Sequence, residues 1–254
     1  MKFLIKIMFI IVMSSPTIGF AAETGYYDLY YFDNQQPKHD YDSSELELDQ
    51  DVEDPFEAIN KIIFSFNYAV DLVIIEPAAF SYKTLTPDII QDSVKNFFLN
   101  LSTPISAINL LLQGRSEEAA EAVGRFITNS TLGCVGLFDI ASEAGIEQRH
   151  EDFGRTLASY GFGNGPYLVL PIIGPSNFRD LIGKGVDFSI DPINKRFSNS
   201  TNTYLGMAKV VYLRAENYNY INNIKYKSLD PYVYMRSIYS QNRSQTIQRR
   251  VHNE

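Results

Sequence analysis

The sequence has little of what enzymes commonly use for chemistry. Of its 254 residues one is cysteine, three are histidine and none is tryptophan. The single cysteine, Cys134, excludes an internal disulfide, and we expect it to be a small buried residue rather than a nucleophile. No histidine pairs with an acid at zinc spacing, and neither a phosphate-cradling glycine loop nor a Gly-x-Ser-x-Gly serine elbow is present. The sequence therefore predicts no metal, no cofactor and no enzyme.

The chain also lacks the basic charge of a nucleic-acid-binding protein. Its net charge is −8, and the acids are concentrated in residues 22–57, where twelve Asp and Glu and five Tyr stand against Lys38 alone. The remainder of the chain is close to neutral. We therefore expect no nucleic-acid partner. We expect residues 22–53 to form an acidic, disordered leader, because they repel one another and show no apolar periodicity.

Residues 1–21 have the order of a secretory signal peptide. Lys2 and Lys6 precede and interrupt an apolar stretch, and small residues follow at Gly19 and Ala21. The apolar part is shorter than the roughly 20 residues that a membrane span needs, which disfavours an uncleaved anchor. No cysteine stands at the predicted cleavage site, so this chain offers no thiol there for a lipid anchor.

We predict that the mature chain begins near Ala22 and carries no lipid at its N-terminus. The reason is the small residues at Gly19 and Ala21 together with the missing cysteine. Intact-mass measurement of the protein taken from membranes should give the mass of the unmodified, cleaved chain. A mass increased by a diacylglyceryl group, or a retained Met1, would contradict the prediction.

Residues 54–240 read as successive capped amphipathic helices, which predicts an all-α domain, followed by a basic C-terminal tail over residues 241–254. One further helix is predicted over residues 205–227. The predicted helix starts are Asp54-Pro55, Thr86-Pro87, Thr103-Pro104, Ser116, Asp152, Ser176 and Asp230-Pro231.

The first of these helices has an unusually wide apolar face. Phe56, Ile59, Ile63, Phe66 and Val70 recur at three- and four-residue steps, with Ile62, Phe64 and Tyr68 beside them. Asn60, Asn67 and Asp71 are the polar exceptions. The pattern fits either a well-buried helix or a helix with protein on one side and lipid on the other.

The stretch Tyr160–Asp180 is apolar and rich in glycine and proline. Proline and glycine make it poor material for a central β-strand, and it is too short to span a membrane. We expect a hinged excursion between two helices that is either buried or wedged into lipid. If the hinge directs the run Tyr167–Ile173, Gly163→Val should impair function by misplacing that run.

Two sets of charged residues were considered for function. Arg149-His150-Glu151-Asp152 is the densest ionisable cluster, and we expect Asp152 to cap a helix and His150 to lie at the surface, with acid–base catalysis as the alternative. Arg125, Arg155 and Arg179 lie within apolar helices, where they contact lipid phosphates or pair with acids such as Asp139 and Asp180.

Seven motifs in order carry a family resemblance. They are DPFEAINKIIFSFN (54–67), NFFLNLSTP (96–104), INLLLQG (108–114), GRFITNSTLG (124–133), GLFDIASEAG (136–145), HEDFGRTLASYGFGNGPYLVLPIIGPSNFRD (150–180) and DPYVYMRS (230–237). Together they resemble the MlaA (VacJ) family of outer-membrane phospholipid transport lipoproteins.

This resemblance implies a fold, a location and a set of partners. The fold is a ring-like bundle of amphipathic helices embedded in one leaflet of the outer membrane, at its periplasmic face, with a polar passage. The function is to remove misplaced phospholipids from the outer leaflet and pass them to a soluble periplasmic lipid carrier, which maintains lipid asymmetry. A trimeric porin is the implied membrane partner. The family is anchored through a cysteine that this chain lacks, so we expect apolar faces and partners to hold it.

The passage and its contacts are predicted on named residues. Lipid-passage candidates are Asn60, Phe66, Asn67, Gly161, Gly163, Gly165 and Tyr167, and phosphate-contact candidates are Arg125, Arg155 and Arg179. Two other functions stay open: a porin-associated structural adaptor of the cell envelope without lipid flux, and a phospholipid hydrolase that uses His150 and Asp152.

Overall fold

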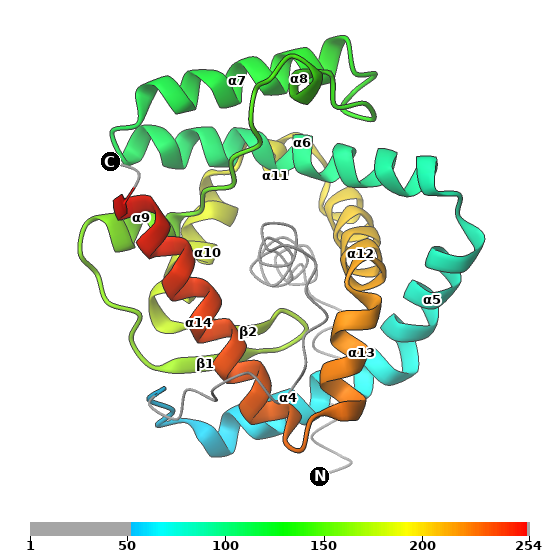
Figure 1. The fold of residues 1–254 in the computed structure, drawn as a ribbon, viewed down its shortest axis with the longest axis vertical. Helices are drawn as coiled ribbons and strands as arrows, with labels where there is room; N and C mark the ends of the chain where they lie inside the picture. Colours follow the sequence, from blue (N-terminus) through cyan, green and yellow to red (C-terminus); the bar gives the residue numbers. More distant parts are fainter. Residues whose placement is uncertain (1–51, 253–254) are drawn as a thin grey trace. The chain divides into compact units, whose positions relative to one another are not determined.

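The computed structural model describes residues 52–252, which fold into two compact units made almost entirely of helices (Figure 1). The first unit contains residues up to Tyr82, Asn164–Phe178 and the chain from Asn199 onward. The second contains Lys83–Gly163 and Arg179–Ser198. The predicted all-α class is confirmed, whereas the ring-like arrangement stays a prediction. The predicted signal peptide and almost all of the acidic leader lie outside the described residues.

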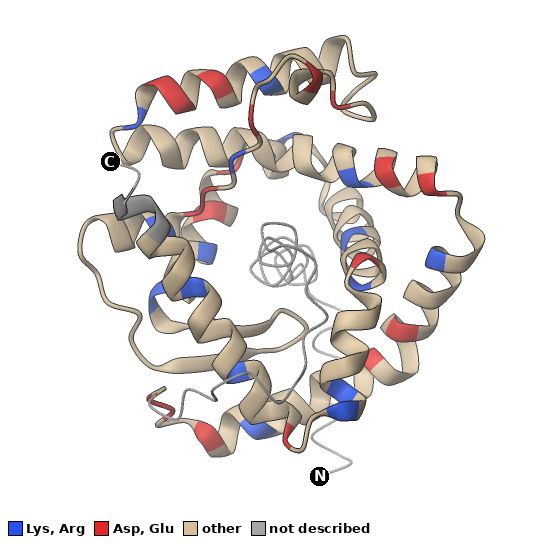
Figure 2. Ribbon diagram, viewed as in Figure 1, with Lys and Arg blue, Asp and Glu red and all other residues tan. Residues whose placement is uncertain are grey.

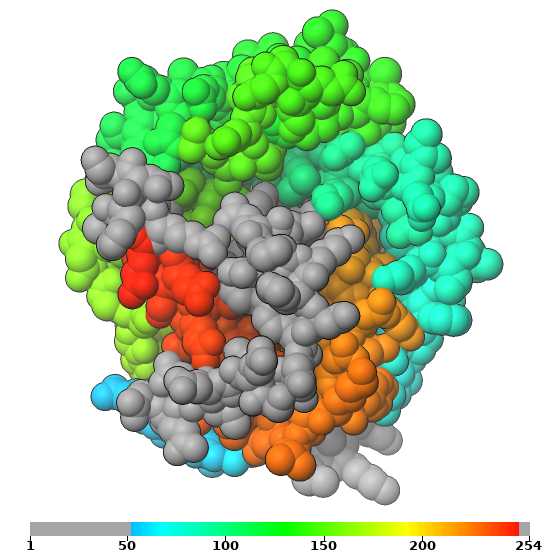
Figure 3. All heavy atoms as spheres, viewed as in Figure 1, coloured from blue at the N-terminus to red at the C-terminus, as the bar shows by residue number. Residues whose placement is uncertain are grey.

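The first unit combines two long helical segments with a small hairpin. Its elements are α4 (Glu57–Val70), the π-helix η1 (Asp71–Ile75), the start of α5 (Glu76–Leu85), β1 (Tyr167–Leu170), β2 (Gly174–Asn177), α12 (Asn199–Glu216), α13 (Tyr218–Lys227) and α14 (Pro231–His252). Helix α14, red in Figure 3, packs against β2. Tyr167 and Val169 of β1 form the core with Tyr232 and Tyr239 of α14. The hairpin is therefore fixed between helices from opposite ends of the sequence.

The second unit is built on a helical hairpin. Its elements are α6 (Asp88–Leu112), α7 (Ser116–Thr131), α8 (Ile140–Glu143), α9 (Phe153–Ser159), α10 (Phe178–Ile190) and α11 (Pro192–Arg196). Helices α6 and α7 lie side by side and bury Ala107, Leu110, Ala119 and Ala122 between them. Small side chains at this contact let the two helices approach closely. The acids of α7 lie in its first half, toward the positive end of the helix dipole (Figure 2).

Several predicted helix ends are confirmed because their signals are local. The Asp152 carboxylate accepts a hydrogen bond from the Arg155 backbone N–H at 2.8 Å and caps α9. Asp230 accepts from the N–H groups of Tyr232 and Val233 and begins α14. Helix α14 continues to His252, so residues 241–252 are helical rather than a separate tail.

Two predicted boundaries within long helical segments are wrong. Thr103-Pro104 does not begin a helix, because α6 continues through Pro104. The hydroxyls of Ser102 and Thr103 both donate to the Leu99 carbonyl, and packing on α7 holds the segment helical although proline cannot donate. The helix predicted over residues 205–227 is instead two helices, α12 and α13, which meet at Asn217.

Tyr160–Asp180, which we expect to be poor material for a central β-strand, contains two short edge strands. Strands β1 and β2 pair antiparallel, with Tyr167 opposite Asn177 and Leu170 opposite Gly174. Pro171 lies in the turn, where Ile172 has a φ of +66° and Gly174 one of +94°. Each strand of a two-stranded sheet is an edge, so proline is tolerated there. Ser176 lies in β2 and not at a helix start, since α10 begins at Phe178.

Cys134 is exposed, contrary to our prediction. It lies in the loop after α7 with a φ of +52°, and Val135 follows at +64°. The backbone of this loop packs closely against α6 at Gly136, where an added Cβ would lie 2.6 Å from the Asn100 side chain. Because glycine backbone fills the inward positions, the cysteine side chain is turned outward.

Candidate functional site

The two asparagines that interrupt the apolar face of α4 hold the hairpin. The Asn60 amide donates to the Tyr167 carbonyl at 3.1 Å, and its oxygen accepts from the Val169 N–H at 2.9 Å. Two turns along the helix, Asn67 donates to the Leu170 carbonyl at 2.9 Å and accepts from the Ile172 N–H at 2.7 Å. The pair, which we call the asparagine clamp, supplies the backbone partners that a third strand would give β1.

An apolar cavity of about 90 Å³ lies beside the asparagine clamp, in the first unit. Its wall comes from α4, η1, the hairpin, α13 and the start of α14. The apolar lining includes Phe64, Val70, Val169, Ile173, Ile221, Ile224 and Met235. Asn67, Asp71 and Lys225 add polar groups to the wall. The cavity thus offers hydrocarbon contact with a few polar groups at its boundary, the composition of a pocket for an amphipathic ligand.

The polar part of the wall belongs to a buried charge cluster of Asp71, Glu76, Arg214 and Lys225. Arg214 is fully buried and contacts the Asp71 carboxylate at 2.9 Å. Lys225 Nζ lies 2.7 Å from Asp71 and 2.6 Å from Glu76. Two acids face two bases, which is the pairing that buried charges require. These contacts fix η1 against α12 and α13.

The π-helix η1 divides one helical segment into an inward and an outward part. Asp71 and Ile75 are buried, whereas Leu72, Val73 and Ile74 between them are exposed. A single π-helical turn inside a longer helix is frequently found at a functional site. Here it turns a carboxylate into the charge cluster while keeping an apolar triplet at the surface.

Within residues 52–252, one helical segment, Glu57–Leu85, is long and apolar enough to cross a membrane. A core helix can pass the same test, but only 28% of the most apolar window of this segment is buried. Its exposed large apolar side chains are Ile59, Ile62, Leu72, Val73, Ile74, Phe80 and Leu85. An apolar surface of this extent marks an interaction surface rather than ordinary solvent exposure.

The predicted passage residues are only partly brought together. Asn60, Asn67 and Tyr167 meet at the asparagine clamp, and Phe66 is buried on α4. Gly165 precedes β1 with a φ of +66°. No local pattern indicates that the asparagines bind backbone, because their partners lie more than 100 residues away.

Gly161 and Gly163 belong to the second unit, in the loop after α9. A Cβ at Gly163 would have nothing within 4 Å, and no positive φ is found there. The steric basis of the predicted Gly163→Val defect is therefore wrong. Gly165 is the constrained position, since its φ is positive and a Cβ would meet the Phe178 side chain at 3.0 Å.

The three arginines considered for phosphate contact all have protein partners. Arg125 is 2% exposed and contacts Asp139, the Ser142 hydroxyl, the Gln148 amide oxygen and the Ile146 carbonyl. Arg179 contacts Asp180 at 2.9 Å. Arg155 contacts Asp152 at 3.4 Å. The pairing that we kept open for Arg125 and Arg179 is the arrangement in the structure, and phosphate contact by these residues stays a prediction.

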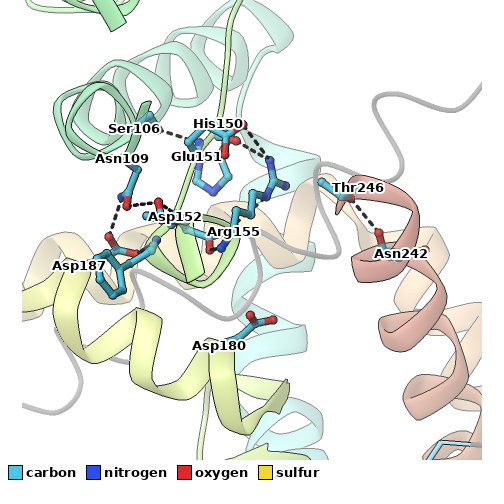
Figure 4. A network of polar contacts seen from close by, with 12 residues as sticks. Ser106, Asn109, His150, Glu151, Asp152, Arg155, Asp180, Asp187, Asn242 and Thr246 are labelled. Carbon is cyan, nitrogen blue, oxygen red and sulfur yellow. Dashed lines mark hydrogen bonds and ion pairs between the residues drawn. The ribbon is translucent and has the colours of Figure 1, made fainter. Parts of the chain in front are cut away.

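A buried polar network in the second unit escaped the sequence analysis. Asp187 of α10 accepts from the Asn109 amide and from the Phe153 N–H, both at 2.8 Å (Figure 4). Burial raises the pKa of Asp187 to about 7, and the neighbouring Asp152 carboxylate adds to this rise. The two hydrogen bonds and Lys184 oppose it. No sequence motif joins Asp187 to Asn109, since 78 residues separate them.

We predict that Asp187 makes the protein less stable as pH rises from about 4 to 7. The folded state keeps its proton up to a pKa of about 7, whereas the unfolded carboxyl loses it near 3.8. Deprotonation therefore favours the unfolded state over this interval. Thermal midpoints measured between pH 4 and 8 should fall more steeply for the native protein than for Asp187→Asn. Parallel pH profiles would contradict the prediction, because other carboxyls contribute equally to both proteins.

Replacing His150 by alanine should leave lipid transport and protein level unchanged. Asp152, by contrast, caps α9, so Asp152→Ala should cost about 1 kcal/mol of stability. Outer-leaflet phospholipid and protein abundance, measured together in cells, check both variants. Loss of transport by His150→Ala at normal abundance would favour the hydrolase alternative.

The chain is similar to known proteins over most of its length. The sequence profile of the MlaA lipoprotein family matches residues 52–246. An uncharacterized protein of Rickettsia bellii is 37% identical over 229 residues, which cover 87% of each chain. The intermembrane phospholipid transport system lipoprotein MlaA of Haemophilus influenzae is 33% identical over 74% of this chain and 77% of its own.

A solved structure shares the fold. It comes from work on the structural basis for maintenance of bacterial outer membrane lipid asymmetry, and it matches with a TM-score of 0.66 at 30% identity. The match covers 77% of this chain and 98% of the other. The intermembrane phospholipid transport system lipoprotein MlaA of Escherichia coli is 37% identical over 131 residues, which cover 50% of this chain and 52% of its own.

Proposed function

The chain belongs to the MlaA lipoprotein family, and on that premise we propose that it removes misplaced phospholipid from the outer leaflet of the outer membrane and passes it to a soluble periplasmic carrier. It thereby maintains lipid asymmetry. The observation that carries the proposal is the apolar cavity beside the asparagine clamp, with polar groups in its wall. A phospholipid needs both kinds of contact, because hydrocarbon does not solvate its headgroup.

The exposed apolar side chains of Glu57–Leu85 support residence at the membrane. Leu72, Val73 and Ile74 project from η1, and Phe80 and Leu85 follow on α5. Burying such side chains in lipid is worth about 25 cal/mol per Å² of apolar surface. These surfaces support residence of the protein at the periplasmic face of the outer membrane.

A transport role also fits the paired state of the charges. Arg214 and Lys225, the bases of the charge cluster in the wall of the apolar cavity, are paired with Asp71 and Glu76, so neither is an unpaired cation that would retain an anionic headgroup. A carrier has to release its lipid, so moderate affinity suits it better than several unpaired cations. We propose a trimeric porin as the membrane partner, as the family resemblance implies.

Extraction from outer membranes tests the proposed function. Phospholipid and a porin should co-purify with the full chain, and its deletion should raise outer-leaflet phospholipid. Filling the apolar cavity by Ile224→Trp should reduce co-purified lipid several-fold. Ala120→Trp, at an exposed position of α7 in the second unit, is the matched control and should have no effect. If a porin co-purifies without lipid, and deletion leaves outer-leaflet phospholipid unchanged, the protein is a structural adaptor instead.

A further inference from the structure

A second cavity, which we call the polar cavity, lies in the first unit and has a volume of about 270 Å³. That is several times the roughly 30 Å³ that one water occupies in the liquid. Its lining residues are Val52, Glu53, Asn164, Gly165, Tyr167, Asn177, Tyr239, Ser240 and Arg243. They come from the segment before α4, from the hairpin and from α14. The segments before α4 and before β1, the hairpin and α14 thus converge on one polar space.

The hydroxyl of Tyr167 points to a missing ligand at this cavity. Tyr167 is 2% exposed, and its hydroxyl has no hydrogen-bond partner among residues 52–252. A buried tyrosine hydroxyl usually has such a partner, because an unsatisfied polar group costs free energy. Tyr167 lines the apolar cavity as well. One side chain therefore borders both a hydrocarbon-lined and a polar space, the juxtaposition that an amphipathic ligand requires.

The charges of the polar cavity match a zwitterion. Among its lining residues Glu53 is the acid and Arg243 the base, and the others are neutral. Arg243 is 2% exposed, so its guanidinium lies away from bulk water, where contact with an anion is strong. Asn177 and Tyr239 are joined by a hydrogen bond of 3.3 Å. A ligand with one phosphate and one primary ammonium would find a counter-charge for each.

The wall is held in place by backbone contacts. The Tyr167 N–H donates to the Glu53 carbonyl at 3.2 Å, which ties the Glu53 segment to β1. The Phe178 N–H donates to the Pro166 carbonyl at 3.1 Å and closes the base of the hairpin. Tyr239 and Arg243 lie one turn apart on α14 and share a face. The acid and the base are thus presented by two separately anchored elements.

We propose that the polar cavity binds the headgroup of phosphatidylethanolamine, with the phosphate at Arg243 and Tyr167 and the ammonium at Glu53. The inference rests on the proposed transport function and gives it a headgroup preference. An anionic headgroup without an ammonium leaves the Glu53 carboxylate facing a like charge. A choline headgroup cannot donate hydrogen bonds to that carboxylate.

Binding of short-chain lipids to the full-length protein in detergent tests the site. The probes are phosphatidylethanolamine, phosphatidylcholine and phosphatidylglycerol with identical acyl chains, and the readout is titration calorimetry. The native protein should bind phosphatidylethanolamine about tenfold more tightly than the other two. Glu53→Gln should abolish this preference while leaving phosphatidylglycerol binding unchanged or tighter. Arg243→Gln should weaken all three lipids about tenfold, and Tyr167→Phe several-fold.

Matched variants separate a binding role from a structural one. Glu57→Gln changes an exposed acid outside the cavity, and Tyr234→Phe removes a tyrosine hydroxyl elsewhere on α14; neither should alter the preference. Arg243→Lys should retain it. If Arg243→Gln fails to fold, Glu53→Gln, at an exposed residue, still decides the matter.

Free phosphoethanolamine and inorganic phosphate distinguish a lipid headgroup from a small anion. Phosphoethanolamine should compete with the lipid, whereas inorganic phosphate should compete at least tenfold more weakly. Equal competition by inorganic phosphate, equal binding of the three lipids, or an unchanged preference in Glu53→Gln would overturn the headgroup site. If the native protein still takes up phospholipid in those cases, transport stands without the site. If it binds no phospholipid at all, both proposals fail.

Discussion

Replacing Asn60 by alanine should lower the thermal midpoint of the protein by about 6–12 °C. The substitution removes the partners of the Tyr167 carbonyl and the Val169 N–H, both at a fully buried site, and one donor to Asp54. Each buried polar group left unsatisfied costs about 1–3 kcal/mol, so a total of about 3 kcal/mol is expected. In a domain of this size one kcal/mol shifts the midpoint by roughly 2–4 °C.

The Asn60 prediction is checked by thermal unfolding in detergent and by protein abundance in cells. Asn60→Asp keeps an oxygen for the Val169 N–H but loses the donor, and it should also be destabilised. Ser65→Ala on the same helix is the matched control, because its hydroxyl lies exposed and binds only the Lys61 carbonyl. A midpoint unchanged in Asn60→Ala would show that the asparagine clamp does not hold β1.

The asparagine clamp shows what a sequence can and cannot predict. Asn60 and Asn67 stand out as polar residues on an apolar face, and their place among the lipid-passage candidates stays a prediction. In the structure both are backbone partners for a strand. The polar interruptions of the apolar face are visible in the sequence because helical periodicity is local. Their hydrogen-bond partners are not visible there, because a hydrogen bond across 100 residues depends on the tertiary fold.

The same distinction separates the helix ends that were predicted correctly from those that were not. Asp152 and Asp230 cap helices through contacts within three residues, so their sequence signals suffice. Pro104 carries an equally strong signal, yet α6 passes through it, because packing against α7 outweighs the lost hydrogen bond. Propensity is a weak prior that tertiary contacts override.

The candidate site was predictable in family but not in geometry. Seven collinear motifs indicated the family, whereas the polar cavity involves Arg243, which we had placed in a basic tail. Asp187, whose pKa is raised to about 7 by burial, carries no sequence signal for this role. Both residues acquire their role through burial, and burial of a charged residue cannot be inferred from its neighbours in sequence.

Replacing Asp71 by leucine should destabilise the protein by about 3–5 kcal/mol, the cost of breaking a buried ion pair. Arg214 is fully buried and would keep only Glu76, at 3.6 Å, as a carboxylate partner, and Lys225 would share it. Two buried cations would then face one acid. The loss should loosen η1 and with it the exposed triplet Leu72–Ile74 that we place in lipid.

A double variant separates the missing charge from the altered packing. Adding Lys225→Met to Asp71→Leu leaves Arg214 opposite Glu76, a balanced pair, so about 2 kcal/mol of the loss should be recovered. The exposed pair Glu57 and Lys61 is the matched control, since its side chains are about half exposed and solvent screening should leave its coupling small. Thermal unfolding of the single and double variants of each pair gives the coupling free energy of that pair. Lipid uptake is measured on the same variants. If Lys225→Met adds to the damage of Asp71→Leu instead of relieving it, packing around η1, rather than charge balance, determines the stability of this wall of the apolar cavity.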